Sequence, residues 1–241
     1  TMKATFMNLK SLACALAVSF FLASCEKEVD SVAPDSALQA SGEQAAKSAT
    51  SQADQEFDRE MQQVINSMMQ QMNQMEMTCD PDIDFSNMMI MHHEMGIRMA
   101  DIELAYGHEP RGLELAAQTK EANQASKERL QAFLASHPTP EPLSKEDCKL
   151  FMMEMKKDMQ RMMQCMRQVR DTPDPDIDFA NLMICHHQGA LAMSNTELKW
   201  GDDAPALEEA ELIIEEQAQE VIELSEFINA HGVPTKKGES L

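Results

Sequence analysis

The stretch "DPDIDFSNMMIMHH" at residues 80–93 returns as "DPDIDFANLMICHH" at residues 174–187, with three differences. The same register, 94 residues apart, holds without a gap from Phe57 and Phe151 to His137 and His231. Self-similarity at a fixed offset indicates an internal duplication in which each copy forms one structural unit. We therefore predict two tandem repeats, at residues 54–140 and 147–234.

Each repeat has the pattern of three helices. We expect the first at about 54–77 and 148–170, the second at 82–106 and 176–200, and the third at 110–136 and 204–230. Asp80 and Asp174 are suited to cap the second helices, because each is followed by a proline at the first helical position. Gly107 and Gly201 are suited to end them. Since no segment alternates with the period of a strand, the predicted fold is all-α.

The N-terminal residues 1–24 have the pattern of a lipoprotein signal peptide. Their apolar run at residues 12–22 is too short to span a bilayer. The following "LASC" at residues 22–25 resembles a lipoprotein cleavage signal, which implies acylation of Cys25, a membrane anchor and a place in the cell envelope, periplasm-facing or surface-exposed. An ordinary secretory signal cut nearby is the alternative. Residues 25–53 predict a flexible tether and residues 235–241 a tail.

The formal net charge of −21 narrows the choice of partners. Such a chain repels nucleic acid and anionic lipid, so we expect no nucleic-acid partner. The charge suits a cationic ligand, and it equally suits plain solubility. Besides Cys25, an exported protein can pair Cys79, Cys148, Cys165 and Cys185 in three ways, and the sequence leaves the choice open.

Paired histidines lie on one face of each second helix. At about 100° per residue, Met89, His92, His93 and Met99 fall within an arc of about 120°, with the small Gly96 between the histidines. In the second copy Met183, His186, His187 and Met193 fall on the same arc around Ala190. The small residue leaves room between the two imidazoles. Glu103 and Glu197 end the arc, either orienting a histidine or lying at a solvated helix end.

Metal binding explains this face better than packing does. Two adjacent buried imidazoles both need hydrogen-bond partners, and the pair occurs twice. Imidazole binds copper, zinc, iron or nickel, and thioether sulfur favours Cu(I), with Cu(II) also held. The predicted ligands are His92, His93, Met89, Met99, His186, His187, Met183 and Met193. Reversible binding needs no catalytic residue, so we expect no enzyme, and the reference histidine pKa of about 6.5 predicts weaker binding between about pH 7 and 5.

The first helices carry a further set of methionines, and the chain has 22 in all. Met61, Met68 and Met72 form a stripe with helical spacing, as do Met155, Met159, Met162 and Met166. Core packing is the favoured interpretation, because methionine fills irregular gaps well. The alternative is that some of these sulfurs complete the metal site from a facing helix.

The stretch "DFANLMICHHQGALAMS" at residues 178–194 resembles the signature of the bacterial family known as domain of unknown function 305. Asp178, Phe179, Met183, His186, His187, Gln188, Ala190 and Met193 carry the resemblance, which extends to both copies. It implies a ferritin-like helical bundle built from two tandem three-helix repeats and exported from the cytoplasm. It also implies copper binding linked to sequestration, tolerance or transfer to a partner protein. The first copy departs from the pattern at Thr119, Lys120, Asn123 and Ser126.

Two other functions are alternatives to copper binding. A ferritin-like di-iron oxidase uses Glu-x-x-His on facing helices, and no histidine in this sequence has a glutamate three residues before it. A metal-free helical scaffold of the envelope would use the methionine stripes for packing or for a partner groove.

Overall fold

The computed structural model describes residues 36–231, with side chains from residue 52 onward. The predicted signal peptide, the predicted acylation site at Cys25 and the predicted tail at 235–241 lie outside the described residues. Within them the secondary structure consists of six helices: α1 (Ser36–Gln74), α2 (Pro81–Tyr106), α3 (Pro110–Ser136), α4 (Lys145–Gln168), α5 (Pro175–Trp200) and α6 (Ala204–His231). No strand occurs among these residues. The predicted all-α fold is confirmed.

The ends of α2 and α5 follow the local rules of helix capping. Asp80 accepts a hydrogen bond from Ile83 N at 3.1 Å, and Asp174 accepts one from Asp176 N at 3.2 Å. A proline occupies the first turn of each helix. Gly107 and Gly201 end them with extended backbone, at φ −65° and −73°, and not in the left-handed conformation. Glycine is needed there for space, since a Cβ on Gly107 would lie 2.5 Å from Glu103 Oε1.

Helix α1 starts earlier than predicted. It begins at Ser36, so that residues 36–53, expected to be a flexible tether, are helical. The stretch is rich in alanine, glutamine and glutamate, all good helix formers, and it contains no proline between Ser36 and Gln74. Composition alone did not separate a solvated helix from a coil here.

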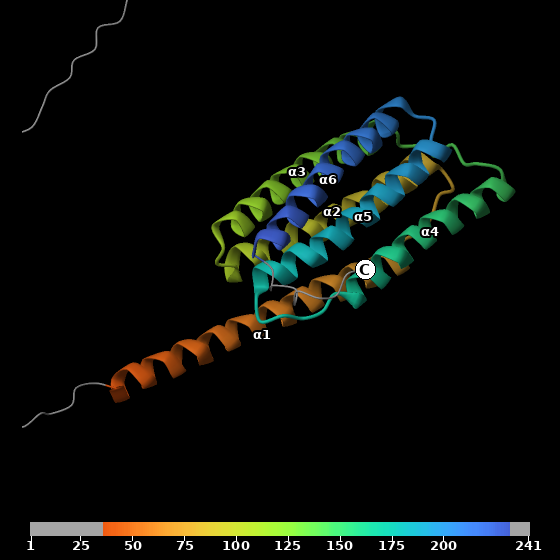
Figure 1. Ribbon diagram of the computed structural model, residues 1–241. Helices are drawn as coiled ribbons and strands as arrows, with labels where there is room; N and C mark the ends of the chain where they lie inside the picture. The colour runs from red at the N-terminus through yellow and green to blue at the C-terminus, as the bar shows by residue number, and fades with distance from the viewer. Residues whose placement is uncertain (1–35, 232–241) are drawn as a thin grey trace, which may run out of the picture. The chain divides into compact units, whose positions relative to one another are not determined.

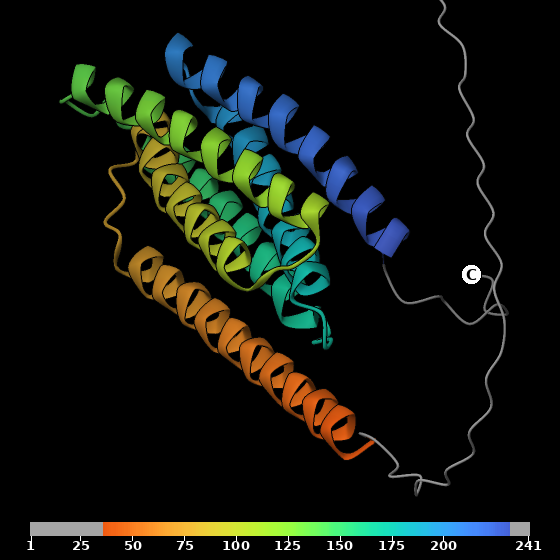
Figure 2. The ribbon, with the colours of Figure 1, turned by 90° about the vertical axis from the view of Figure 1, so that its left-hand side faces the viewer.

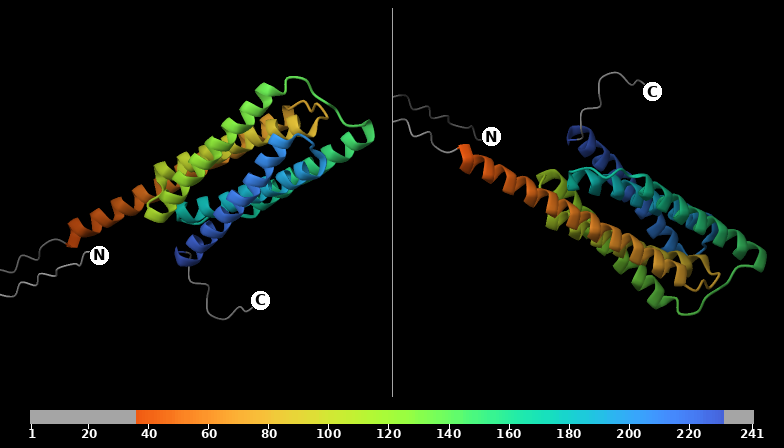
Figure 3. Two further views of the ribbon diagram at one scale, coloured as in Figure 1. Left: turned by 90° about the horizontal axis from the view of Figure 1, so that it is seen from above. Right: turned by 90° about the horizontal axis from the view of Figure 1, so that it is seen from below.

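Among the described residues, those up to Ser41 belong to one unit and residues 42–231 to another. Both repeats lie inside the second unit, so they share one bundle. In that bundle α2 and α5 lie between the pair α3 and α6 and the pair α1 and α4, as Figures 1 and 2 show. Figure 3 shows α1 and α4 side by side when the bundle is seen from below.

The core runs through the middle of these layers. Phe57, Phe85, Phe151 and Phe179 are fully buried, together with many methionines. Disulfides join Cys79 to Cys148 and Cys165 to Cys185, with Cα atoms 5.2 Å and 5.6 Å apart. This settles the pairing that the sequence left open. No helix in the described part of the chain has the length and apolar character needed to cross a membrane.

Candidate metal centre

The predicted face of α2 and α5 is buried throughout. Met89, His92, His93 and Met99 are 0% exposed, and so are their counterparts Met183, His186, His187 and Met193. The two helices pack against each other in the middle of the bundle. The duplicated pattern therefore brings both histidine pairs to one central interface, which we call the histidine centre.

His92 and His186 meet across this interface. Their ring centroids are 3.7 Å apart and the rings are stacked. His92 Nε2 lies 3.1 Å from the carbonyl oxygen of His186, and His186 Nε2 lies 2.9 Å from the carbonyl oxygen of His92. A carbonyl only accepts hydrogen bonds, so both Nε2 atoms carry the proton and both Nδ1 atoms hold the free lone pair.

The two outer histidines have unequal surroundings. His93 Nε2 lies 2.8 Å from Ser126 Oγ, whose hydroxyl donates to Glu209 Oε1 at 2.6 Å. The serine therefore accepts from Nε2–H, which leaves Nδ1 of His93 as the free nitrogen. Arg129 also donates to Glu209, at 2.9 Å from its Nη2, and anchors this chain of contacts.

His187 contacts a polar side chain through each of its ring nitrogens. Its Nδ1 lies 2.9 Å from Gln217 Oε1, an acceptor, so Nδ1 carries a proton. Its Nε2 lies 2.9 Å from Glu220 Oε2, at the distance of an ion pair. Thr119 donates to the same carboxylate oxygen at 2.6 Å. The first copy offers a serine where the second offers a carboxylate, so the two outer imidazoles differ in their electrostatic environment.

Three of the four histidines keep one buried ring nitrogen without a polar partner, which is Nδ1 of His92, His93 and His186, whereas both ring nitrogens of His187 have one. Burial lowers the pKa of His92 and His186 well below the ordinary value, and neighbouring imidazoles lower it further. Burial, followed by the charge of His187, lowers the pKa of His93 to about 3. These three rings are therefore neutral near pH 7, the form that binds metal. An unpartnered buried nitrogen costs about 1–3 kcal/mol.

The histidine nitrogens do not form a complete metal site by themselves. Among the described residues, no three nitrogens of the four histidines gather within 4.8 Å of one another. A metal at the centre would therefore take imidazole nitrogens together with other donors. Met89, Met99, Met183 and Met193 supply fully buried thioethers on the same two helices. This combination fits copper better than zinc, which prefers closed nitrogen, thiolate and carboxylate sets.

The space beside Gly96 is already filled. A Cβ at this position would lie 2.8 Å from His186 Cε1 and 2.6 Å from Asn123 Nδ2. The expectation that the small residue leaves room between two histidines of one copy is thus corrected. It admits the imidazole of the other copy, and this close approach lets His92 and His186 stack.

Glu103 and Glu197 neither orient a histidine nor lie at a solvated helix end, the two alternatives that the sequence left open, because both are fully buried beside aspartates. Burial, and then the adjacent Asp176, raises the pKa of Glu103 to about 9. Burial, and then the charge of Asp82, raises the pKa of Glu197 to about 10. Both glutamates are therefore protonated near pH 7 and act as donors to an aspartate of the opposite helix. Asp176 in turn accepts from the backbone N–H of His108 and Glu109, and Asp82 from that of Asp202 and Asp203.

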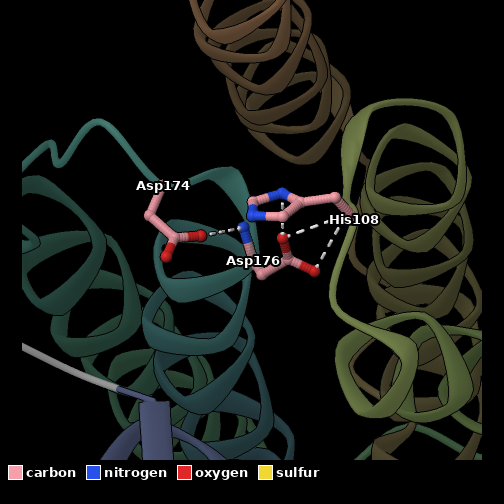
Figure 4. Close-up of side chains that lie close together, drawn as sticks. All are labelled: His108, Asp174 and Asp176. Carbon is pink, nitrogen blue, oxygen red and sulfur yellow. Dashed lines mark hydrogen bonds and ion pairs between the residues drawn. The ribbon is translucent and has the colours of Figure 1, made fainter. Parts of the chain in front are cut away.

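Two clusters outside the histidine centre each bring together three side chains of the kinds that bind metal ions. His108, Asp174 and Asp176 lie together where the segment after α2 meets the start of α5, and Figure 4 shows the imidazole of His108 above the Asp176 carboxylate. The bond from His108 Nδ1 to Asp176 Oδ2 measures 2.7 Å. Because Asp176 already accepts two backbone N–H groups, this cluster is explained as a helix-end contact. Asp58, Asp171 and Asp178 form the second cluster, where burial and Asp171 raise the pKa of Asp178 to about 7.

Comparison with known proteins shows the family to which the chain belongs. The family model described as domain of unknown function 305 (DUF305) matches residues 82–228, more than half of the sequence. The chain belongs to the DUF305 family. A solved structure titled as a DUF305 fragment from Deinococcus radiodurans is similar to this DUF305 protein, with 21% sequence identity and a TM-score of 0.46. That match covers 62% of this chain and 96% of the fragment. No curated protein matches the chain.

Sequence reasoning missed the partners of the outer histidines. Ser126, Gln217 and Glu209 are buried polar residues on the third helix of each repeat. Their positions lie on the same helical stripes as Leu130, Phe133, Leu224 and Phe227, which are core residues. Polar side chains on an otherwise apolar stripe were the available signal. The departures of the first copy at Asn123 and Ser126 lie beside His93 and are part of this signal.

Proposed function

We propose that this DUF305 protein binds copper reversibly at the histidine centre. The observation that carries the proposal is a set of four buried imidazoles, three of which keep an unpartnered nitrogen, on the same two helices as four buried thioethers. Apolar cores do not retain unsatisfied nitrogens without a reason, because each costs stability. Copper would relieve this cost, and the thioethers would favour Cu(I) over other cations.

The chain's own residues prepare the site. The hydrogen bonds from His92 and His186 to main-chain carbonyls fix both rings and aim their free Nδ1 atoms away from those carbonyls. Ser126 and Gln217 fix the outer rings in the same way. Outer-sphere partners of this kind hold a ligand's tautomer and raise its affinity for metal. Binding and release then require no proton donor or acceptor, so no enzymatic step is proposed.

Copper sequestration, tolerance or transfer to a partner protein in the cell envelope is the role that fits this chemistry. The predicted lipoprotein signal and the acylated Cys25 support a membrane-anchored location outside the cytoplasm. The formal charge of −21 supports capture of a cation over contact with nucleic acid.

A Cu(I) competition titration against a colorimetric chelator tests the proposal, with Zn(II) and Fe(II) titrated in parallel. We expect the protein to hold Cu(I) against the chelator and to hold zinc and iron weakly. Replacing His92, His93, His186 and His187 by alanine should lower the Cu(I) affinity of the histidine centre at least a hundredfold, measured as the loss of one tightly held equivalent, while helicity persists. Replacing His137 and His231, which cap helix ends by bonding Phe133 O and Phe227 O, is the matched control.

Undiminished Cu(I) affinity in the fourfold alanine variant would overturn the assignment. Retention of iron through purification with oxygen-dependent turnover would favour the di-iron oxidase. Thermal stability unaffected by any metal would favour the metal-free scaffold, because a ligand that binds only the folded state must raise stability.

A further inference from the structure

A second methionine-rich feature lies on the other side of α2 and α5, between α1 and α4. It is a cavity of about 530 Å³, which we call the methionine groove. From α1 and the residues after it the groove takes Met69, Met72, Met75 and Met77. From α4 it takes Met152, Met155, Met159 and Met163. Met88 of α2 completes the lining sulfurs.

Methionine is the only apolar residue type that lines the groove; the remaining lining residues are Asn73, Lys156, Gln160 and Arg167. The methionines of the groove range from buried to solvent-exposed. Met155 is 1% exposed and Met88 7%, whereas Met152 is 39% exposed. The groove therefore offers thioethers that solvent species can reach, unlike the fully buried histidine centre.

The duplication supplies an internal comparison. Eight of the thirteen lining positions have their counterparts in a separate cavity of about 420 Å³ between the same two helices, which we call the mate groove. Two of these counterparts, Met61 and Met166, are methionine in both grooves. There Ile65 stands in place of Met159, Val169 in place of Met75, and Leu182 in place of Met88. Asp58 and Asp171 stand in place of Met152 and Met77.

The difference in side chains between the two grooves is not explained by packing alone. If packing alone chose the side chains, isoleucine, valine and leucine would serve in the methionine groove as they do in its mate. Volume-conserving exchanges between these residues and methionine are tolerated in cores. Methionine specifies a core poorly, so its accumulation on one side of a duplicated structure points to use of its sulfur.

From this asymmetry we propose that the methionine groove is a second copper site, which holds Cu(I) through thioether sulfurs alone. Thioethers are soft, neutral donors, and among the common biological metals they select Cu(I). Lys156 and Arg167 also line the groove, and their positive charge opposes a divalent cation more strongly than a monovalent one. None of the eight ligand candidates of the histidine centre lines the groove.

The inference rests on the proposed function only in taking copper as the cargo, since it uses none of the same ligands. The groove would be the accessible site and the histidine centre the buried one. A protein with both would bind at least two equivalents of Cu(I), and removal of either site would leave the other.

Methyl NMR of the full chain labelled at methionine Cε tests the proposal directly. Cu(I) added without oxygen should shift the methyl signals of Met72, Met75, Met88 and Met159 by the second equivalent. The methyl signals of Met61, Met68, Met162 and Met166 lie on the same helix layer but outside the groove, and they should move little. Unmoved groove signals at two equivalents would overturn the inference.

A pair of matched variants adds an affinity measurement. The groove variant combines Met72→Leu, Met75→Val, Met88→Leu and Met159→Ile, three of which copy the mate groove. The control variant combines Met61→Leu, Met68→Leu, Met162→Leu and Met166→Leu. With both folded by circular dichroism, we expect the groove variant to lose at least tenfold in Cu(I) affinity for one equivalent and the control less than threefold. Equal losses in the two variants would contradict the proposal.

The fourfold histidine-to-alanine variant separates the two claims. If its groove methyl signals still respond to Cu(I), the groove binds copper whatever the fate of the histidine centre. If wild-type protein binds one equivalent that this variant loses, with groove signals unmoved in both, the histidine centre stands and the groove inference fails.

Discussion

At the scale of single residues, burial decides how the histidines respond to acid. With the reference pKa of about 6.5, the neutral fraction of an imidazole falls about 25-fold from pH 7 to pH 5. The structure instead lowers the pKa of His92 and His186 well below that value and the pKa of His93 to about 3. These rings stay neutral at pH 5, so protons do not compete with metal there.

We therefore expect Cu(I) affinity to change less than about threefold between pH 7 and pH 5. This replaces the weaker binding between about pH 7 and 5 that the sequence predicted. Chelator competition at pH 7, 6 and 5 measures it, with the chelator's own pH dependence subtracted. A fall of about 25-fold for each histidine would show that the rings titrate as exposed groups and that the buried geometry is wrong.

Glu103 and Glu197 make the stability of the fold sensitive to high pH. Their folded-state pKa values of about 9 and about 10 lie above the ordinary 4.5, so the folded protein keeps two protons that the unfolded chain releases. Stability is fully present below about pH 4.5 and is lost as the pH rises toward the folded pKa values. Each pH unit in this interval costs about 1.4 kcal/mol per carboxyl.

Glu103→Gln or Glu197→Gln should therefore raise Tm by about 5 °C or more at pH 8 and change it little at pH 5. The amide supplies the hydrogen-bond donor that the protonated carboxyl provides, without an ionisable group. Glu114→Gln on the exposed face of α3 is the control. Thermal unfolding followed by circular dichroism measures the effect, and equal shifts at both pH values would refute the buried, protonated state.

At the scale of elements, the approach of α2 to α5 depends on Gly96. A methyl group there would collide with the His186 ring and with Asn123. Overpacking of this kind costs about 1–3 kcal/mol. Gly96→Ala should lower Tm by about 3–10 °C and reduce Cu(I) affinity at least tenfold, because it displaces one of the stacked rings.

Ala190→Gly, the reverse change at the matched position of α5, serves as the control, since it removes a methyl group and displaces no ring. We expect it to keep the Cu(I) affinity. Both variants are compared by chelator competition and by thermal unfolding. An unchanged affinity in Gly96→Ala would mean that the stacked pair does not hold the metal.

The helices themselves could be predicted because their signals are local. Asp80 with Pro81 and Asp174 with Pro175 mark the starts of α2 and α5, and the glycines at 107 and 201 follow their ends. The buried arc followed from the 100° step of a helix. The start of α1 could not be placed, because its alanine-rich and glutamine-rich sequence suits both a solvated helix and a coil.

At the scale of the whole molecule, the pairing of the two repeats could not be predicted. One repeat in isolation does not show that His92 stacks on His186 or that Glu103 meets Asp176. These contacts depend on α2 and α5 lying antiparallel in one bundle, which places the end of each beside the start of the other. The partners of the outer histidines, from α3 and α6, were missed for the same reason.

The two disulfides contribute unequally to the stability of the bundle. Cys79–Cys148 closes a separation of 69 residues and links the two repeats, whereas Cys165–Cys185 closes 20 within one repeat. Loop-closure entropy gives about 4 kcal/mol for the longer loop and about 3 kcal/mol for the shorter. Replacing Cys79 and Cys148 by serine should therefore lower Tm more than replacing Cys165 and Cys185. The reverse order in thermal unfolding would contradict this.

In the proposed function, both repeats contribute nitrogen and sulfur donors to one copper-binding interface. X-ray absorption spectroscopy on the full chain loaded with one equivalent of Cu(I) tests it most directly. The predicted spectrum contains both imidazole nitrogen and thioether sulfur scatterers, and the nitrogen contribution disappears when His92, His93, His186 and His187 are replaced by alanine. A spectrum without imidazole scattering, or one unchanged by those substitutions, would refute the proposed site.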